Sequence, residues 1–157
     1  MSMMNKAAAL LCLLAPIFQS QTATSGLKIQ QTITLEGVKG KFDHFAMDEE
    51  GKRLFAAASG NQSVEVIDLA AGKVVDSLKG FGKPQGLAWM ASTRTLFVSD
   101  GGKGELAIYA GSPLKRVKTL SLSEDADDMV YDQATGLLLW AMEDPMQPNL
   151  PRLPLSM

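Results

Sequence analysis

Three pairs of residues recur at a fixed interval in this chain of 157 residues and could act together chemically. Asp43-His44, Gln85-Gly86 and Asp127-Asp128 follow one another at a spacing of 42 residues, and they contain three carboxylates and the only histidine of the chain. Carboxylate oxygens are the ligands that hard cations prefer, and an imidazole nitrogen binds metals or transfers protons. If the fold brings the three pairs to one opening, they suit a divalent cation with a bound water, or a small polar ligand.

The same residues also have a purely structural interpretation. An Asp before a strand often accepts hydrogen bonds from its own turn, and a lone His is often satisfied within a packed interior. A general base needs an orienting carboxylate, and Asp43 would point away from His44 if both lay on a regular strand. We therefore assign no catalytic residue, and both interpretations stay open. The predicted ligand-binding residues are Asp43, His44, Gln85, Asp127 and Asp128, of which Asp43, Asp127 and Asp128 are the candidate metal ligands.

The interval of 42 residues extends well beyond these pairs. Superposing residues 43–80 on residues 85–122 without gaps gives the identical pairs Ala46/Ala88, Leu54/Leu96, Phe55/Phe97, Gly60/Gly102, Lys73/Lys115, Val75/Val117 and Leu78/Leu120. The apolar alternation also stays in phase, because Phe45 falls on Leu87, and a further shift of 42 reaches Met129. The chain therefore contains two copies of a repeat and the first half of a third.

Each copy is predicted to contain four short strands, because the apolar residues alternate with a period of two between turn residues. The expected strands are 44–48, 53–58, 63–69 and 73–78 in the first copy, and 86–90, 95–99, 105–109 and 115–120 in the second. The glycine-rich segment 101–104 lacks the rest of a phosphate-binding motif, so we expect a hairpin turn there. Since no segment after residue 23 has a helical period, the predicted fold class is all-β.

Four antiparallel strands every 42 residues are typical of a β-propeller blade. One blade cannot bury both of its apolar faces, so blades pack against one another around an axis. We predict a partial β-propeller of four-stranded antiparallel blades, with about two complete blades and part of a third. Since the chain holds fewer than three complete blades, we expect it to be an incomplete, N-terminal portion of a propeller. Its open blade faces and free strand edges favour self-association.

Two segments resemble a known family. LFAAASGNQSVEVIDLAAGKVV (54–75) and LFVSDGGKGELAIYAGSPLKRV (96–117) look like the YVTN-type repeats of exported, lactonase-like seven-bladed β-propellers, and FDHFAMD (42–48) looks like the start of one of their inner strands. The resemblance covers about residues 27–140. It implies that the starts of the inner strands line one mouth of a channel where small ligands and metals bind. The Trp-Asp pair of the WD40 class is absent, which weighs against that class.

Residues 1–23 are typical of a secretory signal peptide. Lys6 precedes an apolar run at 7–18, which is shorter than the roughly 20 residues that span a bilayer as a helix. An uncleaved interfacial helix is the alternative. Cys12 is the only cysteine, so removal of the signal leaves no thiol, which suits an oxidising compartment. We expect a periplasmic or secreted protein without a membrane span after cleavage.

The expected organisation is a signal peptide at 1–23, an incomplete propeller at 24–140 and a Pro-rich tail at 141–157. The repeats of the propeller lie at about 43–84, 85–126 and 127–140. The tail spaces its prolines three apart, which fits either a polyproline II ligand or a disordered terminus.

The charge of the chain argues against one class of partner, nucleic acids. The formal net charge is −2, from 15 Lys and Arg against 17 Asp and Glu, and no basic cluster exists for nucleic acid to bind. We expect an exported, non-catalytic module that binds a small molecule or a protein. The alternative is a metal-assisted, lactonase-like hydrolase that uses the carboxylates of Asp43, Asp127 and Asp128, with a divalent cation as its cofactor.

Overall fold

The computed structural model describes residues 26–122, 124 and 126–142. The chain divides into a unit of residues 1–30, of which 26–30 are described and form no helix or strand, and a unit of residues 31–157 that holds every described strand. The predicted signal peptide, with Cys12, lies outside the described residues, and so does the Pro-rich tail from residue 143 onwards. No helix within the described ranges is long and apolar enough to cross a membrane.

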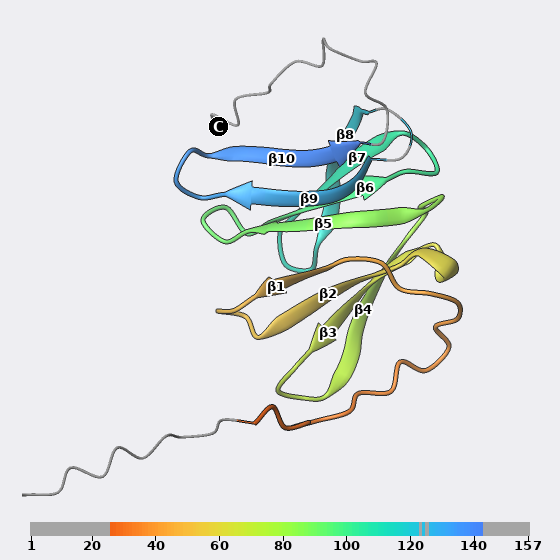
Figure 1. Ribbon diagram of the computed structural model, residues 1–157, viewed down its shortest axis with the longest axis vertical. Coiled ribbons are helices and arrows are strands. Elements are labelled where there is room, and N and C mark those ends of the chain that lie inside the picture. The colour runs from red at the N-terminus through yellow and green to blue at the C-terminus, as the bar shows by residue number, and fades with distance from the viewer. Residues whose placement is uncertain (1–25, 123, 125, 143–157) are drawn as a thin grey trace, which may run out of the picture. The chain divides into compact units, whose positions relative to one another are not determined.

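Ten strands and one 3₁₀ turn form the described part of the larger unit (Figure 1). They are β1 (Phe45–Asp48), β2 (Arg53–Ala58), the turn η1 (Ser59–Asn61), β3 (Ser63–Asp68), β4 (Lys73–Lys79), β5 (Pro84–Met90), β6 (Thr95–Asp100), β7 (Glu105–Ala110), β8 (Lys115–Ser121), β9 (Ala126–Asp132) and β10 (Leu137–Met142). The strands pair antiparallel in the orders β1-β2-β3-β4, β5-β6-β7-β8 and β9-β10. The prediction of an all-β fold with two four-stranded blades and part of a third is therefore confirmed.

The strand positions follow the sequence pattern closely, and the differences lie at strand ends. β1 begins at Phe45 instead of at His44, whereas β5 begins at Pro84 instead of at Gly86. The glycine-rich segment 101–104 forms a turn, as predicted. The last described strand, β10, continues past the predicted domain end at residue 140.

The blades pack face against face through two apolar cores. We call blade 1 the sheet β1–β4, blade 2 the sheet β5–β8 and blade 3 the pair β9–β10. The core between blades 1 and 2 contains Phe55, Ala57, Val64, Val66, Leu78, Phe81, Leu87, Leu96, Val98, Ala107, Tyr109 and Leu114. The core between blades 2 and 3 contains Ala88, Met90, Phe97, Leu106, Ile108, Met129 and Leu138. Blade 2 is therefore apolar on both faces, as a stacked repeat requires.

A partly buried ion pair anchors the turn between β1 and β2. One oxygen of Asp48 accepts hydrogen bonds from Arg53 Nε at 3.0 Å and Nη2 at 2.7 Å, and the other accepts the N–H of Gly51 at 3.0 Å. The Arg53 guanidinium also lies over the rings of Phe55 and Trp89, so the pair reaches from blade 1 to blade 2. Burial alone would raise the pKa of Asp48, but the Gly51 N–H and Arg53 outweigh it and hold that pKa below its ordinary value of 3.8.

We expect Asp48→Asn to lower the melting temperature at neutral pH. The melting temperature of the variant should also fall less steeply than that of the parent as the pH is lowered. A carboxyl with a depressed pKa stabilises the fold above its unfolded pKa, and this stabilisation is lost as the pH falls through its folded pKa. The affected window begins at about pH 4 and extends downward. The measurement is a series of thermal melts from neutral to acid pH, with the exposed Asp76→Asn as the control. If falling pH lowers the melting temperature of the Asp48→Asn variant as steeply as that of the parent, the Asp48–Arg53 pair is not the source of the acid sensitivity.

Candidate functional site

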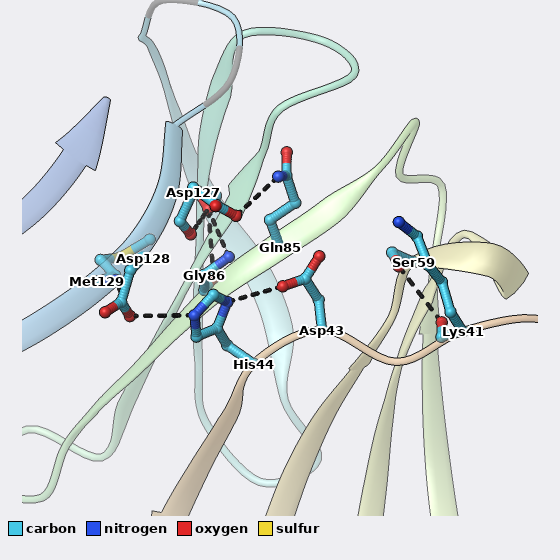
Figure 2. Close-up of polar contacts among 10 residues, drawn as sticks. Lys41, Asp43, His44, Ser59, Gln85, Gly86, Asp127, Asp128 and Met129 are labelled. Atoms are coloured by element: carbon cyan, nitrogen blue, oxygen red, sulfur yellow. Dashed lines mark hydrogen bonds and ion pairs between the residues drawn. The ribbon is translucent and has the colours of Figure 1, made fainter. Parts of the chain in front are cut away.

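The starts of three inner strands lie side by side in this fold (Figures 1 and 2). β1, β5 and β9 are the first strands of successive blades, and β5 packs against both of the others. Since Asp43, Gln85 and Asp127 occupy one position of the repeat, this packing brings them to the same end of the blades. Gln85 Nε2 donates a hydrogen bond to Asp127 Oδ1 at 2.8 Å, which directly joins residues one repeat apart.

His44 lies between two carboxylates that come from different blades. Its Nδ1 is 2.9 Å from Asp43 Oδ1, and its Nε2 is 3.5 Å from Asp128 Oδ1 (Figure 2). Adjacent residues on a regular strand could not meet in this way. Asp43 and His44 do meet because both lie opposite one residue of β2. The Asp43 N–H donates to the Ala57 carbonyl at 2.8 Å and the Ala57 N–H donates to the His44 carbonyl at 3.0 Å, which interrupts the alternation just before β1.

The structure places a set of possible metal ligands at this point. Asp43, His44 and Asp127 each offer one ligand atom, and these three atoms lie within 4.8 Å of one another. The set predicted from the sequence had Asp128 where this set has His44. Asp128 is more exposed, accepts the N–H of Met129 at 2.7 Å and contacts the other ring nitrogen of His44. A carboxylate on the second nitrogen is the usual partner of a metal-binding histidine.

Gly86 and Ser99 set the distance between blades 2 and 3 beside these possible metal ligands. The N–H of Gly86 donates to Ser99 Oγ at 2.8 Å, and the Ser99 hydroxyl donates to the carbonyl oxygen of Asp127 at 3.4 Å. A β-carbon at position 86 would collide with that same carbonyl. Glycine is therefore required for the close approach of β9 to β5.

The supporting roles of these two residues were not predicted from the sequence. Gly86 appeared there only as the partner of Gln85 in a recurring pair. Ser99 falls on Ala57 one repeat earlier, so the repeat gave no signal for a hydroxyl. A polar residue inside an otherwise apolar strand such as β6 was the one available hint.

Gln85 has an unused hydrogen-bond acceptor next to these possible metal ligands. Its side chain is only 4% exposed, and its Oε1 has no hydrogen-bond partner within the described part of the chain. Buried polar atoms in proteins are nearly always paired. The Gln85 amide therefore has the capacity to accept one hydrogen bond from a bound group or its water.

Comparison with known proteins supports the fold. No protein-family model matches the chain, and no curated protein is significantly similar in sequence. Hydrazine synthase of Kuenenia stuttgartiensis matches with a TM-score of 0.61 and 17% identity, over 73% of this chain and 32% of that chain. The Cps50 (Swd1) β-propeller domain of Myceliophteria thermophila matches with a TM-score of 0.52 and 16% identity, over 62% and 31%. Sqt1 of Saccharomyces cerevisiae matches with a TM-score of 0.56 and 12% identity, over 64% and 29%.

These similarities define the class of protein as a β-propeller. The chain spans about a third of the length of the solved structures that it matches. One of these structures is named as a β-propeller domain, and this chain lacks the Trp-Asp pair of the WD40 class. Blade packing depends on apolar alternation and repeat spacing instead of on that dipeptide, so the shared fold does not separate WD40-like from YVTN-type repeats. Sequence identity at this level indicates fold and not activity.

Proposed function

We propose that the chain is a binding module of an exported, YVTN-type β-propeller and that its site is the cluster formed by Asp43, His44, Gln85, Asp127 and Asp128. One observation carries this proposal: equivalent positions of successive repeats come together, because Gln85 donates a hydrogen bond to Asp127 at 2.8 Å and one ligand atom of Asp43 lies within 4.8 Å of one of Asp127. The cluster joins carboxylates, an imidazole and a buried acceptor at one end of the inner strands, where a ligand can approach from solvent. No part of the proposal requires catalysis.

A divalent cation is the ligand that suits this donor set best. Two carboxylates with one imidazole favour Mn²⁺ or Zn²⁺, whereas Ca²⁺ and Mg²⁺ prefer oxygen ligands. Asp43, Asp127 and His44 Nδ1 would hold the ion, and Asp128 would keep the imidazole oriented through Nε2. Gln85 Oε1 would accept a hydrogen bond from water on the ion.

We expect Mn²⁺ or Zn²⁺ to raise the melting temperature of the purified chain and Asp127→Asn to abolish the rise. An ion at a hundredfold excess over its dissociation constant stabilises a fold by about 2.7 kcal/mol. Thermal melts over a cation titration measure the effect. The matched control is Asp132→Asn, which changes a carboxylate on the same strand but outside the cluster and should leave the rise intact.

Three results would overturn this account of the site. A melting temperature that no divalent ion changes, or that rises equally in the Asp127→Asn variant, removes the cation from the cluster. The metal-loaded chain should also release no acid from a small lactone beyond a metal-only blank. Acid release that disappears with Asp127→Asn would replace binding by lactonase-like hydrolysis as the function.

A further inference from the structure

The first and last described blades each expose a narrow apolar strip on their inner strands. The leading strip consists of Phe45 and Met47 on β1, which are 55% and 51% exposed. The trailing strip consists of Val130 on β9 and Leu139 on β10, which are 57% and 51% exposed and pair across the ladder. Exposed apolar side chains that gather on one face of a sheet are candidates for an interaction site.

The leading strip occupies positions that contact the preceding blade elsewhere in the chain. One repeat after Phe45 and Met47 stand Leu87 and Trp89, which pack in the core between blades 1 and 2. A second repeat reaches residues 129 and 131, which pack in the core between blades 2 and 3. Phe45 and Met47 are therefore placed to receive a blade that precedes blade 1.

The trailing strip occupies the complementary positions, which contact the following blade. One repeat before Val130 and Leu139 stand Ala88 and Phe97, which face blade 3 in the second core. Two repeats before Leu139 stands Phe55, which faces blade 2 in the first core. Both interblade contacts within the chain thus join trailing positions of one blade to leading positions of the next.

We propose that the trailing strip of one copy packs against the leading strip of a second copy, head to tail. This contact would continue an interface that the same repeat positions already form twice within one chain. Such an interface is heterologous, so an open assembly always leaves one leading and one trailing strip free, and copies add until a ring closes. On the outer part of the leading face Glu65 and Ile67 are buried, so the exposed contact surface is confined to the inner strand. We therefore expect weak association that depends on concentration.

Sedimentation velocity of two one-sided variants tests the proposal. Phe45→Glu disables the leading strip and Leu139→Glu disables the trailing strip, and both side chains are exposed enough for the fold to survive. The parent chain should form larger species as its concentration rises from low to high micromolar. Each variant alone should remain a monomer, and an equimolar mixture should form a dimer and nothing larger, because one intact strip of each kind remains. Val75→Glu changes an exposed apolar residue outside both strips and should associate like the parent.

Each other outcome contradicts the proposal. A parent chain that stays monomeric leaves the strips to a different occupant, such as another protein. A one-sided variant that still associates alone indicates a two-fold contact or another surface. A mixture that stays monomeric while circular dichroism shows both variants folded excludes the head-to-tail contact. The uncharged pair Met47→Gln and Val130→Gln repeats the test if either glutamate variant fails to fold.

Discussion

Gly86→Ala lowers the melting temperature of the chain and removes its response to divalent cations; this is the expected result of adding a single β-carbon. That carbon would collide with the carbonyl of Asp127 and crowd the Ser99 hydroxyl, so β9 must move away from β5. Overpacking of this kind costs about 1–3 kcal/mol, or roughly 4 °C of melting temperature per kcal/mol in a domain of this size. The movement would also separate Gln85 from Asp127 and disperse the proposed cation ligands.

Thermal melts with and without Mn²⁺ check this prediction. The control is Gly26→Ala, because an added β-carbon there meets nothing within 4 Å. If Gly86→Ala melts like the parent and keeps the cation response, the close approach of blades 2 and 3 does not hold the cluster together.

Phe97→Ala is expected to cost about 3–5 kcal/mol of folding free energy. The ring is 1% exposed and lies in the core between blades 2 and 3, so its removal leaves a cavity that the rigid ladders cannot close. Leu139 occupies the equivalent position one repeat later but is half exposed. Leu139→Ala should therefore change stability by less than about 1 kcal/mol.

Urea denaturation at low protein concentration, where copies do not associate, compares the two variants. Phe55→Ala extends the comparison to the first core and should resemble Phe97→Ala. Equal losses for Phe97→Ala and Leu139→Ala would mean that both positions are buried alike, which contradicts the half-exposed position of Leu139.

The strands and their order could be predicted because their signals are local and repeated. Apolar alternation and the Gly and Asn turns gave β2 and the turn after it without knowledge of the fold. The repeat spacing then placed Asp43, Gln85 and Asp127 at equivalent positions, since adjacent blades superpose by one period. Both inferences need only the amino-acid sequence and the alternation of side chains along a strand.

The details of the site depend on geometry that no sequence pattern specifies. The contact between Asp43 and His44 exists because both residues lie opposite Ala57, which interrupts the alternation just before β1. The role of Gly86 depends on how closely β9 approaches β5, and that of Ser99 depends on the same distance.

An acidic residue outside the cluster has a purely structural role. Asp100 is buried at the end of β6 and accepts the backbone N–H groups of Gly82 and Lys83 at 2.8 and 2.7 Å. Its oxygens are therefore occupied by the chain itself. The carboxylates of the cluster contact mainly side chains, namely those of His44 and Gln85, which a ligand can displace or join. Residue type alone could not separate these two environments.

Stacking of successive blades is the claim on which the site, the end strips and the proposed function all depend, and one nuclear Overhauser measurement tests it directly. Phe55 on β2 and Trp89 on β5 belong to different blades, and their ring centroids lie 5.1 Å apart. We expect cross-peaks between the Phe55 ring protons and the Trp89 indole protons. Their absence, while both rings show cross-peaks to neighbours within their own sheets, would contradict the stacked arrangement.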